Sequence, residues 1–175
     1  MTSAAVALRL TDVNRMSAAE FRQALGGVFE HSPWIAERAW AARPFASVQT
    51  LHAAMTAVVR AASPAERLAL LRAHPDLAGR AALAGALGDS SRAEQASAGL
   101  DRLTDDEHER FSRLNAAYRA KFNFPFIVAV RRHDKAAILA AFEQRLGNTR
   151  EAEIEAALGQ VFAITRGRLD ALVTA

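Results

Sequence analysis

Apolar residues recur at helical spacing along most of the chain. After Ser17 they fall at Phe21, Leu25, Val28 and Phe29, which is the three-to-four-residue repeat of a helix that buries one face. The same repeat predicts further helices over residues 33–39, 47–59, 63–73, 89–100, 104–118, 134–146 and 149–169. The pattern therefore indicates an all-α protein, a single-domain bundle of about seven to nine helices.

Polar capping residues mark where several of these helices begin. Ser17–Glu20, Ser63–Glu66 and Thr104–Glu107 each match the capping box, in which the first and fourth residues satisfy N–H groups at the helix start. Asp134 and Asp89–Ser91 are expected to cap the helices that follow them. These signals support the helix assignments independently of the apolar repeat.

The run Phe124–Val130 is the one β-like stretch of the chain. It contains Pro125 and has no obvious partner strand, so we expect a buried extended segment or a helix. In an extended segment, buried main-chain groups must find partners, and a small polar ligand could supply them. A plain core segment fits the same pattern equally well.

Length and composition fit one globular domain. The 175 residues are 51% apolar, enough to bury a core. We expect residues 1–14 to form a loose tail and residues 15–175 to form the single helical domain. The chain has no cysteine, which excludes a disulfide scaffold, a thiolate zinc site, an iron–sulfur cluster and a cysteine nucleophile.

The charge pattern argues against nucleic acid as a partner. The sequence pI is about 10.1, but the formal charge is only +3, and the arginines are scattered among acids rather than gathered on one tail. Neither a secretory signal nor an apolar run of about 18 residues is present, so we expect a cytoplasmic protein with no membrane partner. A noncatalytic helical interaction module is the alternative class.

Five histidines are present, and one differs from the others by its position. None forms a His-x-x-x-His or His-Glu-x-x-His pair, so a helical metal site has no local support. His74 precedes Pro75, which forces the preceding helix to end near Ala73 or His74. At a helix C-terminus the imidazolium form is favoured, which suits a proton donor. A histidine that only caps its own helix is the simpler interpretation of these residues alone.

Two further positions could carry chemistry. Glu94 and Gln95 lie one turn after Ser91, so a carboxylate, an amide and a hydroxyl could together bind an imide- or urea-like ligand. An acid in a first helical turn is also favoured by the helix dipole, without any ligand. Arg168 could pair with a substrate carboxylate, although an arginine on a terminal helix is usually solvated.

Several short motifs, taken in order, carry a family resemblance. They are His31–Ile35, Ala73–Gly79, Ser91–Gln95, Ala98–Leu100, Phe111–Tyr118, Lys121–Ile127, Arg145–Asn148 and Arg168–Leu169. In this order and spacing the chain resembles the OHCU decarboxylases, which convert 2-oxo-4-hydroxy-4-carboxy-5-ureidoimidazoline (OHCU) to (S)-allantoin in urate degradation. The resemblance implies an all-helical fold, no metal or organic cofactor, a small ureidoimidazoline substrate and a homodimer.

The resemblance also implies roles for individual residues. His74 would be the proton donor and Glu94 a second catalytic residue that orients it or the substrate. The implied substrate contacts are Pro75, Ser91, Arg92, Ala93, Glu94, Gln95, Arg168 and the main chain of Phe126, Ile127, Val128, Ala129 and Val130. Asn123 stands where the family commonly has glycine, and asparagine tolerates the positive φ that such a turn requires.

Overall fold

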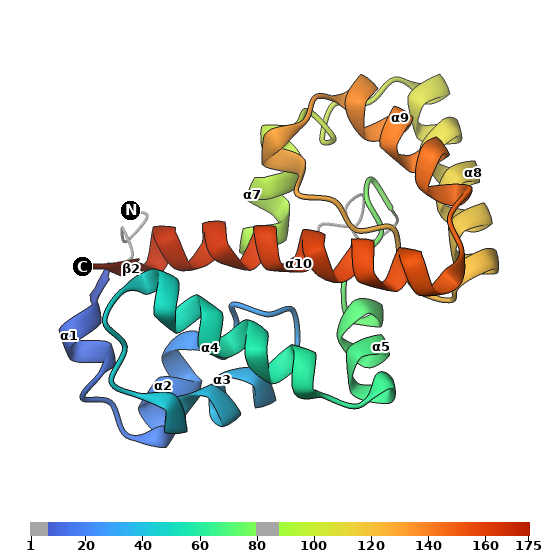
Figure 1. Cartoon of the computed structure of the whole chain (residues 1–175). Coiled ribbons are helices and arrows are strands. Elements are labelled where there is room, and N and C mark those ends of the chain that lie inside the picture. The colour runs from blue at the N-terminus through green and yellow to red at the C-terminus, as the bar shows by residue number, and fades with distance from the viewer. Residues whose placement is uncertain (1–6, 80–87) are drawn as a thin grey trace. The chain divides into compact units, whose positions relative to one another are not determined.

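The computed structural model describes residues 7–79 and 88–175, and its regular secondary structure is almost all helix (Figure 1). The elements in chain order are β1 (Leu8–Arg9), α1 (Leu10–Val13), α2 (Ala18–Leu25), α3 (Trp34–Ala39), η1 (Trp40–Ala42), α4 (Val48–Ala61), α5 (Pro64–Arg72), α7 (Asp89–Ser97), α8 (Asp105–Phe122), η2 (Val130–Arg132), α9 (Lys135–Leu146), α10 (Arg150–Leu172) and β2 (Val173–Thr174). The described residues thus contain nine α-helices, which confirms the all-α prediction.

The capping residues act largely as the sequence indicates. The side chain of Ser17 accepts a hydrogen bond from the Glu20 N–H, and Thr104 accepts one from Glu107 in the same way. Asp134 caps α9 through the N–H of Ala137. These caps satisfy N–H groups that the first helical turn leaves without an intrahelical partner.

Two local predictions differ from the structure. Residues 8–13, expected in a loose tail, form β1 and α1, with Leu10 and Val13 buried; residues 1–6 of that tail lie outside the described residues. The Asp89–Ser91 segment does not cap α7 from outside, because the helix already begins at Asp89 and Gly88 occupies the cap position with no side-chain hydrogen bond.

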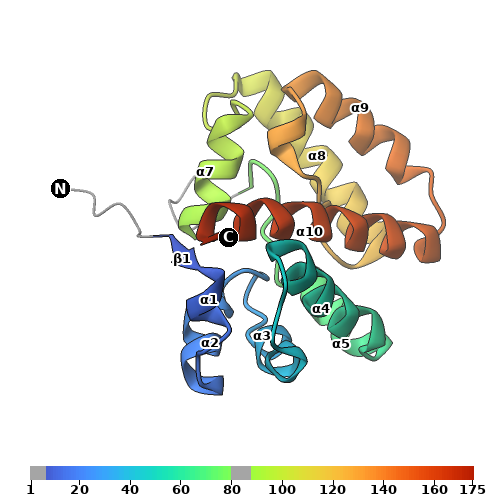
Figure 2. The same cartoon turned by 60° about the vertical axis from the view of Figure 1, so that its left-hand side comes forward.

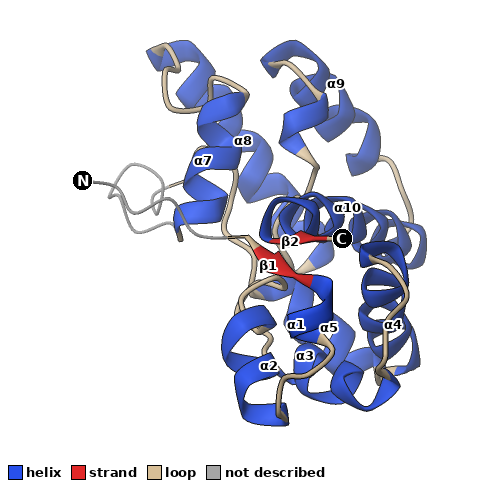
Figure 3. Cartoon of the chain, turned by 90° about the vertical axis from the view of Figure 1, so that its left-hand side faces the viewer, coloured by secondary structure: helices blue, strands red, loops and turns tan. Residues whose placement is uncertain are grey.

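The chain divides into two compact units. One comprises Met1–Leu70 and Phe162–Ala175, and the other Leu71–Val161. In the first unit α3 packs against α2 and α4, and β1 pairs in parallel with β2, Leu8 opposite Val173 (Figure 3). Its fully buried side chains include Phe21, Leu25, Ile35, Leu51, Met55 and Val59. Pairing with a distant strand explains why no local pattern marks β1.

The second unit is built around α8 and α9, which pack side by side (Figure 2). An aromatic cluster fills the space between them, and Tyr118 contacts four of its rings: Phe122, Phe124, Phe126 and Phe142. Phe126 stacks on Phe142 with ring centroids 3.9 Å apart. The run 124–130 therefore packs into the core through two of its own aromatic side chains, Phe124 and Phe126.

Residues 124–129 form neither helix nor strand, and every residue from Phe124 to Val130 is buried. Of the expectations for this run, its burial is confirmed, and the helix is wrong for residues 124–129. Within residues 7–79 and 88–175, no helix combines the length and the apolar character needed to cross a membrane.

Candidate active site

His74 lies in the turn that ends α5. The helix ends at Arg72, two residues before His74, as Pro75 requires. The His74 N–H donates to Leu71 O over 3.3 Å, and the residue is only 6% exposed. A histidine so enclosed is placed by its surroundings rather than left to sample solvent.

Hydrogen bonds from the rest of the second unit hold residues 72–79, the segment around His74, in place. Their hydrogen bonds are Arg72 Nε to Asn123 O (2.9 Å), Arg119 Nε to Asp76 Oδ1 (2.8 Å), Asn115 Nδ2 to Leu77 O (2.9 Å) and Ala78 N to Gln95 Oε1 (3.0 Å). One of these bonds lies before His74 in the sequence and three lie after it, so the chain is anchored on both sides of the histidine. We call residues 72–79 the His74 loop.

The backbone of the His74 loop is itself unusual. Ala78 adopts φ +49°, a left-handed conformation that costs a non-glycine residue about 1 kcal/mol. A Cβ added to Gly79 would lie 2.7 Å from Asp76 Cβ, so this position needs glycine. Asn123, which ends α8 and accepts from Arg72, has φ +62°, which confirms the positive φ expected there.

Helix α7 presents three predicted substrate contacts on one face. Ser91 and Gln95 are buried and Glu94 is half-buried, whereas Arg92 and Ala93 are exposed. Residues three and four apart lie on the same face of a helix, so hydroxyl, carboxylate and amide stand together. Because Gln95 accepts from the Ala78 N–H, this face is joined directly to the His74 loop.

Helix α7 also packs against η2, which begins at Val130. The structure thus brings together the His74 loop, the polar face of α7 and the end of the 126–130 run, three segments that are far apart in the sequence. The Arg92 side chain lies near Asp89 on the exposed part of α7, with Nη1 3.8 Å from Oδ1.

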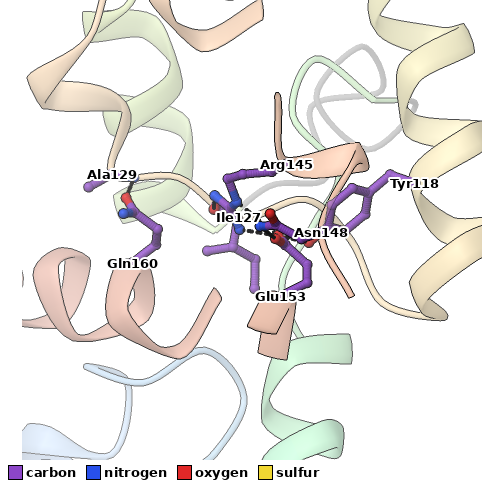
Figure 4. Close-up of polar contacts among 7 residues, drawn as sticks. All are labelled: Tyr118, Ile127, Ala129, Arg145, Asn148, Glu153 and Gln160. Carbon is purple, nitrogen blue, oxygen red and sulfur yellow. Dashed lines mark hydrogen bonds and ion pairs between the residues drawn. The ribbon is translucent and has the colours of Figure 1, made fainter. Parts of the chain in front are cut away.

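Two main-chain groups of the 126–130 run are already bonded within the protein (Figure 4). Arg145 Nη1 donates to Ile127 O over 2.6 Å, and Gln160 Oε1 accepts from the Ala129 N–H over 3.0 Å. The carbonyls of Ala129 and Val130 accept from η2 and the residue after it. Among the described residues, no hydrogen bond uses the N–H or C=O of Val128.

Sequence reasoning missed the buried network behind this run. Arg145 pairs with Glu153, whose side chain is fully buried and also accepts from Tyr118 Oη and Asn148 Nδ2 (Figure 4). Burial and the hydrogen bond to Glu153 raise the pKa of Tyr118 well above its ordinary value. Arg145 and Asn148 stand in a motif that carried the resemblance, which was the only available signal.

Arg168 belongs to the other unit. It is 9% exposed at its side chain, pairs with Glu30 over 2.9 Å and donates to Val28 O over 3.2 Å. It is therefore not a solvated terminal arginine. Its role toward a substrate stays a prediction.

A cavity of about 830 Å³ adjoins the His74 loop and α8. Its lining includes Asp76, Gly79, Asn115 and Arg119, and of the predicted site residues only Pro75. The cavity therefore adjoins the His74 loop but does not include the polar face of α7.

A buried histidine thus lies on a turn held by several hydrogen bonds, beside a helix that presents a hydroxyl, a carboxylate and an amide, and these are residue types that a helical enzyme can use on a small polar ligand. A family model described as OHCU decarboxylase matches residues 14–170. The 2-oxo-4-hydroxy-4-carboxy-5-ureidoimidazoline decarboxylase of Haloferax volcanii is 46% identical over 93% of this chain and 94% of its own. The chain belongs to the OHCU decarboxylase family.

Two further proteins resemble this chain over part of their own length. The uric acid degradation bifunctional protein of Bacillus subtilis is 41% identical over 94% of this chain and 33% of its own. A crystal structure of (S)-allantoin synthase aligns with a TM-score of 0.75 and 36% identity, over 95% of this chain and 54% of that chain. The all-helical fold is therefore shared with a solved protein of related sequence.

Proposed function

We propose that this chain decarboxylates OHCU to (S)-allantoin and that His74 donates the proton. One observation carries the proposal: Gln95 holds the His74 loop through the Ala78 N–H, so the proton donor and the polar face of α7 are parts of one rigid arrangement. Family membership supports the reaction, because the Haloferax volcanii relative is named for this decarboxylation.

The reaction needs an electron sink and one proton. The bond between the ring carbon and the carboxylate breaks, CO₂ leaves, and the electron pair delocalises into the conjugated ring. That enolate-like intermediate then takes a proton at carbon, which creates the stereocentre of allantoin. We propose that the ring itself serves as the sink, without a metal or an organic cofactor. The enzyme must then hold one face of the ring toward His74, and general acid catalysis contributes on the order of 10²–10⁴-fold.

The groups that would bind the substrate include both hydrogen-bond donors and acceptors, which a ring with hydroxyl, ureido and carbonyl groups requires. Glu94 and the Ser91 hydroxyl can accept hydrogen bonds from the hydroxyl and ureido groups. Among the described residues, Gln95 uses only Oε1 within the protein, so its two Nε2 protons can donate to substrate oxygens. Val128 offers one main-chain donor and one acceptor, which match a ring N–H and C=O pair.

The remaining elements of the proposal rest on the family resemblance. Arg168 is proposed as the cationic partner of the substrate carboxylate, in addition to its ion pair with Glu30. We further propose a cytoplasmic homodimer that acts on the small molecule alone, without nucleic acid or membrane as partner. Size-exclusion chromatography with light scattering checks the dimer directly.

Freshly generated substrate tests the proposed activity. OHCU is produced in situ from urate with the enzymes that precede this step, the chain is added, and circular dichroism follows the allantoin formed. We expect faster allantoin formation than in the blank without this chain, and a product enriched in the S enantiomer. Racemic allantoin formed at the rate of the blank would reject the proposed function.

A further inference from the structure

The Arg145–Asn148 motif has no role in the reaction described so far. Both of its polar ends contact Glu153 on α10: Arg145 Nε and Nη2 donate to Oε1 over 2.8 and 2.5 Å, and Asn148 Nδ2 donates to Oε2 over 2.8 Å. Tyr118 donates to the same carboxylate from α8. Glu153 is fully buried, so these donors compensate a charge that would otherwise be costly to bury.

This network fixes the position of the Arg145 guanidinium. Its Nη1 is left to bond Ile127 O over 2.6 Å, while its Cζ lies 4.5 Å from the centroid of the Phe126 ring. Two helical turns along α10 from Glu153, Gln160 accepts from the Ala129 N–H. Arg145 and Gln160 therefore hydrogen-bond the main chain of the two residues on either side of Val128, Ile127 and Ala129 (Figure 4).

The two hydrogen bonds at Ile127 and Ala129 also set the directions of the Val128 N–H and C=O, because each peptide bond is planar. In a trans peptide the C=O and the next N–H point in opposite directions. With Ile127 O directed to Arg145, the Val128 N–H points away from Arg145. With the Ala129 N–H directed to Gln160, the Val128 C=O points away from Gln160. The N–H and C=O of Val128 are therefore both directed away from the side chains that bond its neighbours, which leaves one donor and one acceptor of a single residue for a ligand.

We propose that Arg145, held by Glu153, and Gln160 are positioning residues that orient Val128 to bind an N–H–C=O unit of the substrate ring. This inference rests on the proposed function. It adds that the N–H and C=O of Val128 bind the ring, and that Arg145 and Gln160 hold them in place. A cyclic ureide or amide supplies the complementary acceptor and donor side by side. A carboxylate at that place would lose the bond to the Val128 C=O, and an apolar edge would lose both bonds.

Substitutions at Gln160 test the inference without disturbing the buried charges. Gln160→Met removes the acceptor for the Ala129 N–H at similar volume, and Gln160→Glu keeps an acceptor there. Gln144→Met is the matched control, because Gln144 is an exposed glutamine of α9. The measurements are KM and kcat on OHCU generated in situ, the melting temperature, and the amide resonance of Val128 in ¹⁵N-labelled protein titrated with (S)-allantoin.

We expect Gln160→Met to raise KM about 3- to 10-fold, the worth of one hydrogen bond, with kcat changed less than twofold. The response of the Val128 amide to (S)-allantoin should weaken in the same variant. Gln160→Glu and Gln144→Met should keep the KM and the Val128 response of the parent chain, with all melting temperatures within a few degrees. A structural role alone would shift the melting temperature and leave KM unchanged.

The two proposals fail in different ways. If the parent chain turns over OHCU and Gln160→Met retains its KM and Val128 response, the positioning role is wrong while the activity stands. If the parent chain makes no (S)-allantoin, the proposed function is wrong. In that case the amide resonance of Val128 still tests the positioning role. A resonance that responds to (S)-allantoin only when Gln160 is intact supports that role, whereas a resonance that does not respond overturns both proposals.

Discussion

Tyr118 offers a sharp test of the buried network, because it is the only tyrosine of the chain. Its hydroxyl donates to the fully buried carboxylate of Glu153. Tyr118→Phe keeps the ring contacts in the aromatic cluster and removes one hydrogen bond to a charged acceptor. Such a bond contributes about 1.5–3 kcal/mol. Arg145 and Asn148 still serve Glu153 in the variant, so we expect the lower end, about 1.5–2 kcal/mol.

The pH dependence of stability separates this bond from ordinary packing. The pKa of Tyr118 is raised in the folded chain by burial and by Glu153, whereas in the unfolded chain it is close to 10. The unfolded state therefore loses the phenol proton first as pH rises. The raised pKa contributes its full share to the free energy of unfolding below pH 10. Above pH 10 this contribution falls by about 1.4 kcal/mol per pH unit. Tyr118→Phe should lack this component.

Two assays measure these effects. Urea unfolding followed by far-ultraviolet circular dichroism gives the free energy of unfolding of both proteins between pH 7 and 11. Absorbance at 295 nm reports ionisation of the single phenol, which we expect near pH 10 in urea and at clearly higher pH in the folded chain. A phenol that ionises near pH 10 in the folded chain, or a variant within about 0.3 kcal/mol of the parent at pH 7, would refute a Tyr118–Glu153 bond.

Two further predictions concern the two units separately. Gly79→Ala places a Cβ 2.7 Å from Asp76 Cβ, so we expect a loss of about 1–3 kcal/mol in thermal unfolding, and an unchanged melting temperature would contradict the tight turn. The pKa of His52 is lowered, first by burial, so its protonation favours the unfolded chain and stability should fall as pH drops below about 6.5. His52→Gln should flatten that dependence, and an equally steep fall in the variant would show that another group causes it.

The fold follows largely from local signals. Capping boxes at Ser17 and Thr104 and the apolar repeat locate most helices, since both signals act within one or two turns. Pro75 likewise ends α5 before His74 by a purely local steric effect. The segment at residues 8–13 escaped prediction because its strand pairs with Val173 and Thr174, at the other end of the chain.

The site divides in the same way between local and distant effects. That Ser91, Glu94 and Gln95 share a face follows from their spacing on a helix. That Gln95 holds Ala78, and that Arg145 holds Ile127, depends on contacts between separate elements, which a single sequence does not display. A buried ion pair such as Arg145–Glu153 leaves no periodic pattern, so the residues that position the site are harder to predict than those on its surface.

The proposed reaction requires above all that His74 protonates the ring. The most direct measurement compares the parent chain, His74→Asn and the control His133→Asn on OHCU generated in situ, because His133 is an exposed histidine of the same unit. With far-ultraviolet circular dichroism unchanged, His74→Asn should lose about 10²–10⁴-fold in kcat and the allantoin should lose its S excess, while His133→Asn matches the parent. Enantiopure (S)-allantoin formed by His74→Asn at the parent rate would show that His74 is not the proton donor.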